Sequence, residues 1–277
     1  MKKMTKRTAI VLSVVIVFGT LFTGLEISFA RWKKKGVWSP DYQMVALDEI
    51  LEKSEFTDED YALLYRQTGL TKLGVDGLME DNQKNKIKLI QERYFSKKSI
   101  RYDPILPYVA VGYLSDYGVL CELENGDIIV SASTSVAGIR VGHAALVVDG
   151  AQGIVLESLQ IGYDSSFADA VSETEMTTYM VLRPTGIPVE IRESVAKYAF
   201  NELVGIPYNQ IVGLIPKKYQ EEITSTQCSH LCWYAYMKFG YDLDSNGGIF
   251  VAPKDLANSP YLEVVQIFGF DPEKLWK

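Results

Sequence analysis

Cys228 and His143 are the residues of this chain whose types and positions suit thiol chemistry. Cys228 stands in Thr226-Gln227-Cys228-Ser229 at the start of an apolar, helix-like segment, and His143 opens the strand-like segment at residues 142–148. The chain contains only two histidines and three cysteines, so each position is informative. A thiol at a helix N-terminus with a positioned imidazole beside it is the minimum for a cysteine nucleophile.

The expected surroundings of Cys228 favour its thiolate. Thr224, Ser225 and Thr226 precede the cysteine and could cap the helix. The thiol would then lie in the first turn, at the positive end of the helix dipole, among N–H groups that could stabilise an oxyanion. A small buried packing residue is the alternative role for Cys228.

The remaining cysteines and the second histidine are weaker candidates. Cys232 lies one turn further along the helix, past the strong part of the dipole, and Cys121 follows an apolar segment that predicts a strand. A disulfide between Cys228 and Cys232 would be hard to form within one helix. His230 is two positions after Cys228, which rotates it by about 200° on a helix and indicates a packing or surface role. His143 is therefore the candidate base, and Gly142 before it would let a substrate approach the backbone.

Glu157 is the candidate for a third residue, which would orient the imidazole. It lies in an otherwise apolar segment, residues 154–158, where a carboxylate needs a partner. If the strands at 143–148 and 154–158 form a hairpin, Glu157 shares the face of His143 in two registers. The two residues can pair directly, or Glu157 can oppose Ala145 and reach His143 diagonally over about 7 Å. A register shifted by one residue would separate them, and a solvated edge-strand charge is the alternative.

Tyr208 follows Pro207 in a break before the cysteine-bearing helix. Its hydroxyl could donate to an oxyanion or to the substrate, and a loop aromatic packed on the core is the alternative. The sequence contains no spaced metal-ligand motif, no phosphate loop and no serine nucleophile elbow, so we expect neither a metal nor a cofactor.

The elements that must position these residues form an α+β pattern. A helical region is expected at residues 31–104, with an apolar face at 47–51, a capping box from Thr57 to Asp60 whose helix Gly69 ends, and a third helix over 75–94. The later chain predicts short antiparallel strands at 127–131, 143–148, 154–158 and 178–182, and helices at 189–203 and 227–239.

Residues 1–30 have the pattern of a secretory signal peptide. Lysines and an arginine come first, residues 8–23 are mostly apolar, and Ser28-Phe29-Ala30 places small residues at a cleavage site. Basic residues directly after Ala30 disfavour cleavage, so an uncleaved membrane anchor is the alternative. No cysteine stands near the cleavage point, which argues against a lipoprotein. We therefore expect a secreted or cell-surface protein.

The composition is that of an ordinary globular protein, with 47% hydrophobic and 23% charged residues among 277. The net charge of −7 argues against nucleic acid as the main partner, because no surplus of basic residues is present to neutralise phosphates.

Several segments over about residues 105–265 form a pattern through their order and spacing: 125–129, Gly142-His143-Ala144, Leu156-Glu157-Ser158, Pro207-Tyr208-Asn209, Gln227-Cys228-Ser229 with 233–236, and 251–256. Together they resemble the circularly permuted branch of the NlpC-type papain-like cysteine hydrolases, the YiiX/YebB-like group. Histidine before cysteine is the permuted order. Residues 65–70 are similar to the helical prelude of some exported members.

The resemblance implies a permuted papain-like domain at residues 105–277, with an antiparallel sheet packed against helices. It implies Cys228 as nucleophile, His143 as base, Glu157 as the residue that orients the base, and Tyr208 near the oxyanion. Papain-like enzymes often carry a glutamine some residues before the cysteine. Gln227 is directly adjacent instead, so that role is not transferred.

The leading functional expectation is an exported thiol hydrolase that cleaves an amide or peptide bond through an acyl-enzyme, with cell-wall peptide as the expected substrate. The second is a lipid acyltransferase or thioesterase, because lecithin-retinol acyltransferase-like proteins also look permuted and carry a segment resembling Cys228-Ser229-His230. The third is a non-catalytic surface module that uses the fold to bind a ligand.

Overall fold

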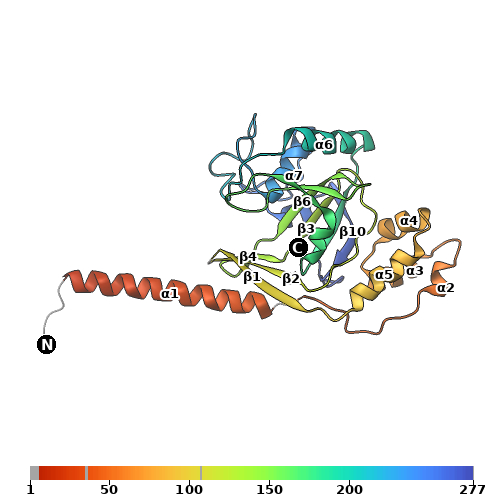
Figure 1. The fold of residues 1–277 in the computed structure, drawn as a ribbon, viewed down its shortest axis with the longest axis horizontal. Helices are drawn as coiled ribbons and strands as arrows, with labels where there is room; N and C mark the ends of the chain where they lie inside the picture. The colour runs from red at the N-terminus through yellow and green to blue at the C-terminus, as the bar shows by residue number, and fades with distance from the viewer. Residues whose placement is uncertain (1–5, 35–36, 107, 277) are drawn as a thin grey trace.

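A six-stranded antiparallel sheet forms the centre of the computed structural model, which describes residues 6–34, 37–106 and 108–276 (Figure 1). The strand order is β10-β9-β3-β6-β7-β8, and a second antiparallel sheet has the order β1-β2-β4-β5. The strands of the first sheet are β3 (Ile128–Ser131), β6 (His143–Asp149), β7 (Ile154–Glu157), β8 (Ser166–Asp169), β9 (Tyr179–Pro184) and β10 (Leu262–Phe268). Those of the second are β1 (Ile100–Leu106), β2 (Val109–Leu114), β4 (Thr134–Val136) and β5 (Ile139–Arg140).

The helices lie on both sides of the first sheet (Figure 1). The N-terminal helices are α1 (Lys6–Lys34), α2 (Asp48–Leu51), α3 (Asp58–Thr68), α4 (Lys72–Glu80) and α5 (Lys84–Phe95). The later ones are the 3-10 helix η1 (Ala170–Glu175), α6 (Val189–Glu202), α7 (Cys228–Met237) and α8 (Pro253–Ala257). The protein is thus a mixed arrangement of two antiparallel sheets packed against helices.

Both faces of the central strands are buried. Along β6, Ala144 and Leu146 belong to the apolar core that includes residues of α6 and α7, whereas Ala145 and Val147 belong to the core that includes residues of α3, α4 and α5. This division follows the two-residue period of a strand. Helices α2 to α5 therefore cover the second face of the sheet, and without them that apolar face would be exposed to water.

Some expected elements are confirmed and others are wrong. The capping box of Thr57 with Asp60 starts α3, and Gly69, at a φ of 75°, follows its last residue. The single helix expected over 75–94 is wrong: α4 and α5 are separate, and Asn82 between them has a φ of 55°, a left-handed conformation that asparagine tolerates.

The region expected to be helical up to residue 104 already contains the start of β1 at Ile100. Strand β10 was not expected either, although Val264, Val265 and Ile267 are residues that favour a strand, and it pairs with β9.

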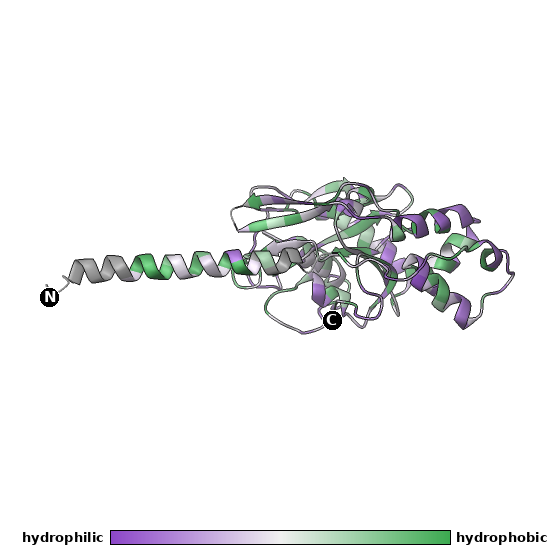
Figure 2. Ribbon diagram, turned by 90° about the horizontal axis from the view of Figure 1, so that it is seen from below, coloured by the Kyte–Doolittle hydropathy of each residue, from purple (hydrophilic) through white to green (hydrophobic). Residues whose placement is uncertain are grey.

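The N-terminal helix α1 runs without interruption from Lys6 to Lys34 and extends away from the sheets (Figures 1 and 2). It includes Ser28-Phe29-Ala30, the expected cleavage site, whereas Lys2 and Lys3 lie outside the described residues. Within the described part of the chain, no helix combines the length and the apolar character needed to cross a membrane.

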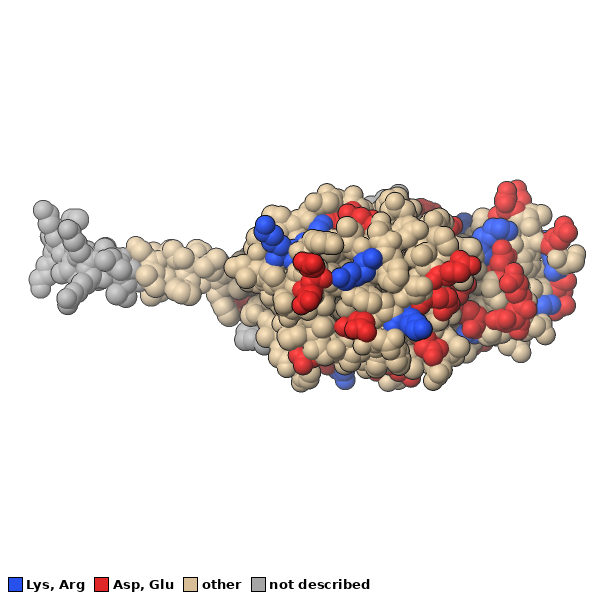
Figure 3. All heavy atoms as spheres, turned by 90° about the horizontal axis from the view of Figure 1, so that it is seen from above, with Lys and Arg blue, Asp and Glu red and all other residues tan. Residues whose placement is uncertain are grey.

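Charged side chains are mixed on the surface and lie most densely over the end formed by α2 to α5 (Figure 3). Ion pairs join these helices to one another. Lys84 Nζ lies 3.1 Å from Glu52 Oε1, and Lys88 Nζ lies 2.5 Å from Asp48 Oδ1.

A buried ion pair fixes the start of β3 to β9. Arg183 Nε and Nη2 donate to the two carboxylate oxygens of Asp127 at 3.1 and 2.9 Å, and Asp127 is fully buried. We expect Arg183→Met to lower the free energy of unfolding by about 3–5 kcal/mol, because it leaves a buried charge without a partner. Urea denaturation measures the loss. Arg101→Met, which removes an exposed pair with Asp103, is the matched control and should cost less than about 1 kcal/mol.

Candidate active site

The hairpin of β6 and β7 brings His143 and Glu157 together. Ala145 lies opposite Glu157, which is the second of the two registers that place Glu157 on the face of His143. The diagonal reach is short enough for a direct contact: His143 Nε2 and Glu157 Oε2 are 2.6 Å apart. Glu157 is not on an edge strand, because β8 pairs with β7 on its other side.

Gly142 meets a requirement of the backbone at this position. Its φ is 86°, and a Cβ atom there would lie 2.3 Å from the carbonyl oxygen of Ser131 and 2.5 Å from the ring of Trp276. The expectation that Gly142 gives a substrate close access to the backbone stays a prediction. The glycine allows the tight entry into β6 that places His143 at the start of the strand.

Cys228 is the first residue of α7, but its cap differs from the expected one. The N-cap residue is Gln227, not Thr224, Ser225 or Thr226. Gln227 Oε1 accepts hydrogen bonds from Ser229 N at 3.1 Å and from Cys228 Sγ at 3.2 Å, and its Nε2 donates to Val251 O at 2.8 Å. Gln227 thus holds the helix N-terminus and contacts the thiol directly. The sequence offered only its adjacency to Cys228 as a signal.

The electrostatic environment favours a protonated His143. Burial by itself lowers the pKa of this imidazole, but the charge of Glu173 and hydrogen bonding with Cys228 and Glu157 outweigh burial and raise the pKa well above its ordinary value. For Glu157, burial acts to raise the pKa, and the hydrogen bond with His143 lowers it to below its ordinary value. The arrangement therefore suits an imidazolium held between a carboxylate and a thiol.

Tyr208 is held next to the N-terminus of α7. It forms a β-bridge with Thr226, and its backbone N–H donates to Tyr163 O at 3.1 Å. Burial, with a contribution from the Cys228 charge, raises the pKa of Tyr208. The phenol consequently stays protonated and can act as a hydrogen-bond donor near the thiol.

His230 has the packing role expected from helical phase. Its Nε2 donates to Lys218 O at 2.7 Å, and Nδ1 accepts from the Thr226 hydroxyl at 2.9 Å. Burial lowers its pKa to about 4, so this ring is neutral at pH 7.

Glu173 is a site residue that sequence reasoning missed. It lies in η1, is buried, and its Oε1 is 3.8 Å from His143 Nε2. No local pattern marks it, because it stands in an irregular segment 30 positions from His143.

His143, Glu157 and Glu173 each offer a potential ligand atom, and these atoms lie within 4.8 Å of one another. Carboxylate and imidazole donors suit several divalent ions. However, His143 Nε2 already makes a hydrogen bond with Glu157 at 2.6 Å, which a metal would have to break. We therefore interpret the three side chains as a hydrogen-bonded, titrating cluster.

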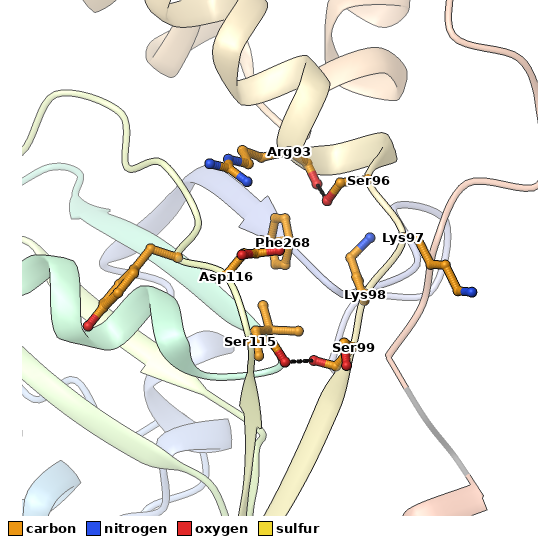
Figure 4. Close-up of a pocket in the computed structure, with 10 residues that line it drawn as sticks. Arg93, Ser96, Lys97, Lys98, Ser99, Ser115, Asp116 and Phe268 are labelled. Carbon is orange, nitrogen blue, oxygen red and sulfur yellow. Dashed lines mark hydrogen bonds between the residues drawn. The ribbon is translucent and has the colours of Figure 1, made fainter.

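Two surface hollows lie away from this cluster. The first, drawn in Figure 4, has a volume of about 10 Å³, room for about one water molecule, and lies between the end of α5 and the start of β1. The second is a groove of about 360 Å³ that includes Asp149 and Arg192. Asp149 ends β6, whereas His143 begins it, so this groove lies at the opposite end of the strand, about 20 Å away.

Thiol labelling can rank the three cysteines by their reactivity, and all three are free and buried. Burial raises the pKa of Cys121 to about 12 and that of Cys232 well above its ordinary value, so neither should form a thiolate near neutral pH. We expect iodoacetamide at pH 6–7 to modify Cys228 first, as measured by peptide mass spectrometry. His143→Ala should slow that modification sharply. Equal rates at Cys228 and Cys232 would contradict the assignment.

No protein-family model, curated protein or solved structure matches the chain.

Proposed function

We propose that the protein is a thiol hydrolase that cleaves an amide or peptide bond through an acyl-enzyme on Cys228. The observation that carries the proposal is the 2.6 Å contact of His143 with Glu157, together with the hydrogen bonding of His143 with Cys228, the first residue of α7. A buried carboxylate fixes one imidazole nitrogen and leaves the other for the thiol, as nucleophilic catalysis by cysteine requires.

The reaction would proceed in two stages. The Cys228 thiolate attacks the carbonyl carbon, while the Tyr208 hydroxyl and first-turn N–H groups of α7 other than that of Ser229, which Gln227 caps, stabilise the oxyanion. The His143 imidazolium gives its proton to the leaving amine as the C–N bond breaks, which leaves a thioester. His143 then takes a proton from a water molecule that attacks the thioester, and Cys228 is released with the acid product.

The permuted papain-like assignment forms part of this proposal. It is supported by the order of the residues, with His143 and Glu157 on a hairpin that precedes the helix of Cys228. Two antiparallel sheets packed against helices agree with it but occur in many folds. The basic, apolar and small-residue pattern of residues 1–30 supports export to the cell surface or beyond, where a cell-wall peptide would be accessible.

A second candidate function is transfer or hydrolysis of an acyl group. It is favoured by exposed apolar side chains on the loops that adjoin Tyr208. One loop hydrogen-bonds to Tyr208, and the other follows it in the chain. The exposed residues of these loops are Tyr163, Ile211, Leu214, Ile215 and Tyr219. Such a rim suits the acyl chain of a lipid as well as an apolar peptide side chain.

The deciding experiment is incubation of the protein with a panel of muropeptides and acyl lipids, followed by mass spectrometry of the products. Cys228→Ser is the control for background reactions. We expect cleavage of an amide bond in one or more muropeptides by the wild type and none by Cys228→Ser. Turnover of acyl lipids alone would favour the second candidate, and identical products from both proteins would overturn both.

A further inference from the structure

Glu173 is a second buried carboxyl group beside His143 that the proposed reaction does not use. It is 3% exposed, and its Oε1 lies 3.8 Å from His143 Nε2, the nitrogen that also contacts Glu157. Its other oxygen, Oε2, has no hydrogen-bond partner among the described residues. Burying a carboxyl group with one oxygen unpaired is costly, which calls for a reason why this residue is placed here.

Two carboxyl groups at one imidazole nitrogen repel each other when both are ionised, so one tends to keep a proton. Burial raises the pKa of Glu173 to about 7, although the charge of His143 opposes the rise and that of Glu157 adds to it. Glu173 is consequently a neutral acid below neutral pH and a carboxylate above it. Glu157, whose pKa is lowered, is ionised throughout this range.

We propose that Glu173 is a positioning residue for His143, whose carboxylate stabilises the protonated imidazole at alkaline pH. His143 would thereby keep the proton that it gives to the leaving group under conditions in which a free imidazole has lost it. This role rests on the proposed function of His143, but the electrostatic coupling itself can be measured without a substrate.

The other titratable groups around His143 and Glu173 do not provide the change in charge that Glu173 undergoes near neutral pH. Tyr113 of β2 lies close enough to sense the charge of His143, and burial raises its pKa. Cys232 of α7 senses the charge of Glu173, and burial raises its pKa well above the ordinary value. Cys228 carries the reacting thiol, so its titration has to be removed before that of His143 is read.

The test is an NMR titration of the histidine rings in full-length Cys228→Ser protein, which has no thiol at position 228. Only two histidines contribute signals, and His230, with a pKa lowered to about 4, titrates separately. We expect Glu173→Gln to lower the pKa of His143 by about one unit or more, because a neutral amide replaces the carboxylate. Glu173→Asp should restore part of the shift.

Glu175→Gln is the matched control, since Glu175 lies in the same 3-10 helix but does not contribute to the pKa shift of His143. An unchanged His143 pKa in Glu173→Gln, or an equal shift in Glu175→Gln, would overturn the proposal. A stoichiometric divalent metal that is found in the purified protein and lost from Glu173→Gln would also overturn it. Thermal melting of each variant confirms that it is folded.

Enzyme kinetics provides a second readout, measured on variants that keep Cys228. In Glu173→Gln the alkaline limb of the kcat/KM profile should move to lower pH by about the same amount as the NMR shift, with the acid limb unchanged. A purely structural role would lower the rate at every pH without moving the limb. If the NMR shift is present and no substrate is hydrolysed, the proposed function fails while the coupling of Glu173 to His143 stands.

Discussion

Replacing Cys228 with alanine should lower kcat/KM by a factor of about 10⁴ or more on any substrate of this site. The substitution removes the sulfur atom on which the proposed acyl-enzyme forms. Cys232, one turn further along α7, is fully buried and its pKa is raised well above the ordinary value. The measurement is steady-state hydrolysis of a substrate identified in the muropeptide and lipid panel.

Cys232→Ala is the matched control for this result. It removes a thiol from the same helix and should leave kcat/KM unchanged, while lowering the free energy of unfolding by roughly 1 kcal/mol through lost packing. Thermal melting of both variants separates loss of chemistry from loss of folding. A fully active Cys228→Ala protein, or an inactive but folded Cys232→Ala protein, would show that the thiol of Cys228 is not the nucleophile.

The second large effect is expected for Glu157→Gln, which should lower kcat/KM by about 10²–10⁴. The carboxylate holds Nε2 of His143 at 2.6 Å and fixes the direction of the ring. The amide keeps the shape but loses the charge that helps to raise the pKa of His143. The imidazolium is then lost at lower pH, so the alkaline limb of the rate profile moves down together with the maximum rate. This joint change distinguishes Glu157→Gln from Glu173→Gln, which is expected to move the limb alone.

The same substitution has a predictable effect on stability. The folded pKa of Glu157 is below its ordinary value of 4.5, so its ionised form stabilises the fold above that pH, and the contribution is lost as pH falls through the folded pKa. The difference in free energy of unfolding between wild type and Glu157→Gln should thus be larger at pH 7 than at pH 3. Glu263→Gln, an exposed glutamate in β10, should change neither activity nor the pH dependence. A pH-independent difference for Glu157→Gln would contradict the role of its charge.

Local patterns in the sequence were sufficient where the relevant partners are close along the chain. The capping box at Thr57 and Asp60 and the helical phase that turns His230 away from Cys228 both depend on residues within one turn. His143 and Glu157 are 14 positions apart and lie in one hairpin. The alternation of side chains along the strands therefore left two registers that place both residues on the same face. The structure has the one with Ala145 opposite Glu157.

Features that depend on distant partners could not be read in this way. Gln227 caps α7 and also donates to Val251 O, 24 positions away. The central strands are apolar on both faces because helices cover each of them, so alternation does not reveal which helix packs where.

The sequence alone therefore determined the helix that carries Cys228 and the strand parity that allows Glu157 to reach His143, since these follow from short-range backbone geometry. Only the tertiary structure decided that Gln227 contacts the thiol, that Tyr208 lies beside it and that Glu173 is buried against the imidazole. Those contacts are made by side chains from separate elements, and their positions are set by the packing of helices on both faces of the sheet, which no local pattern encodes.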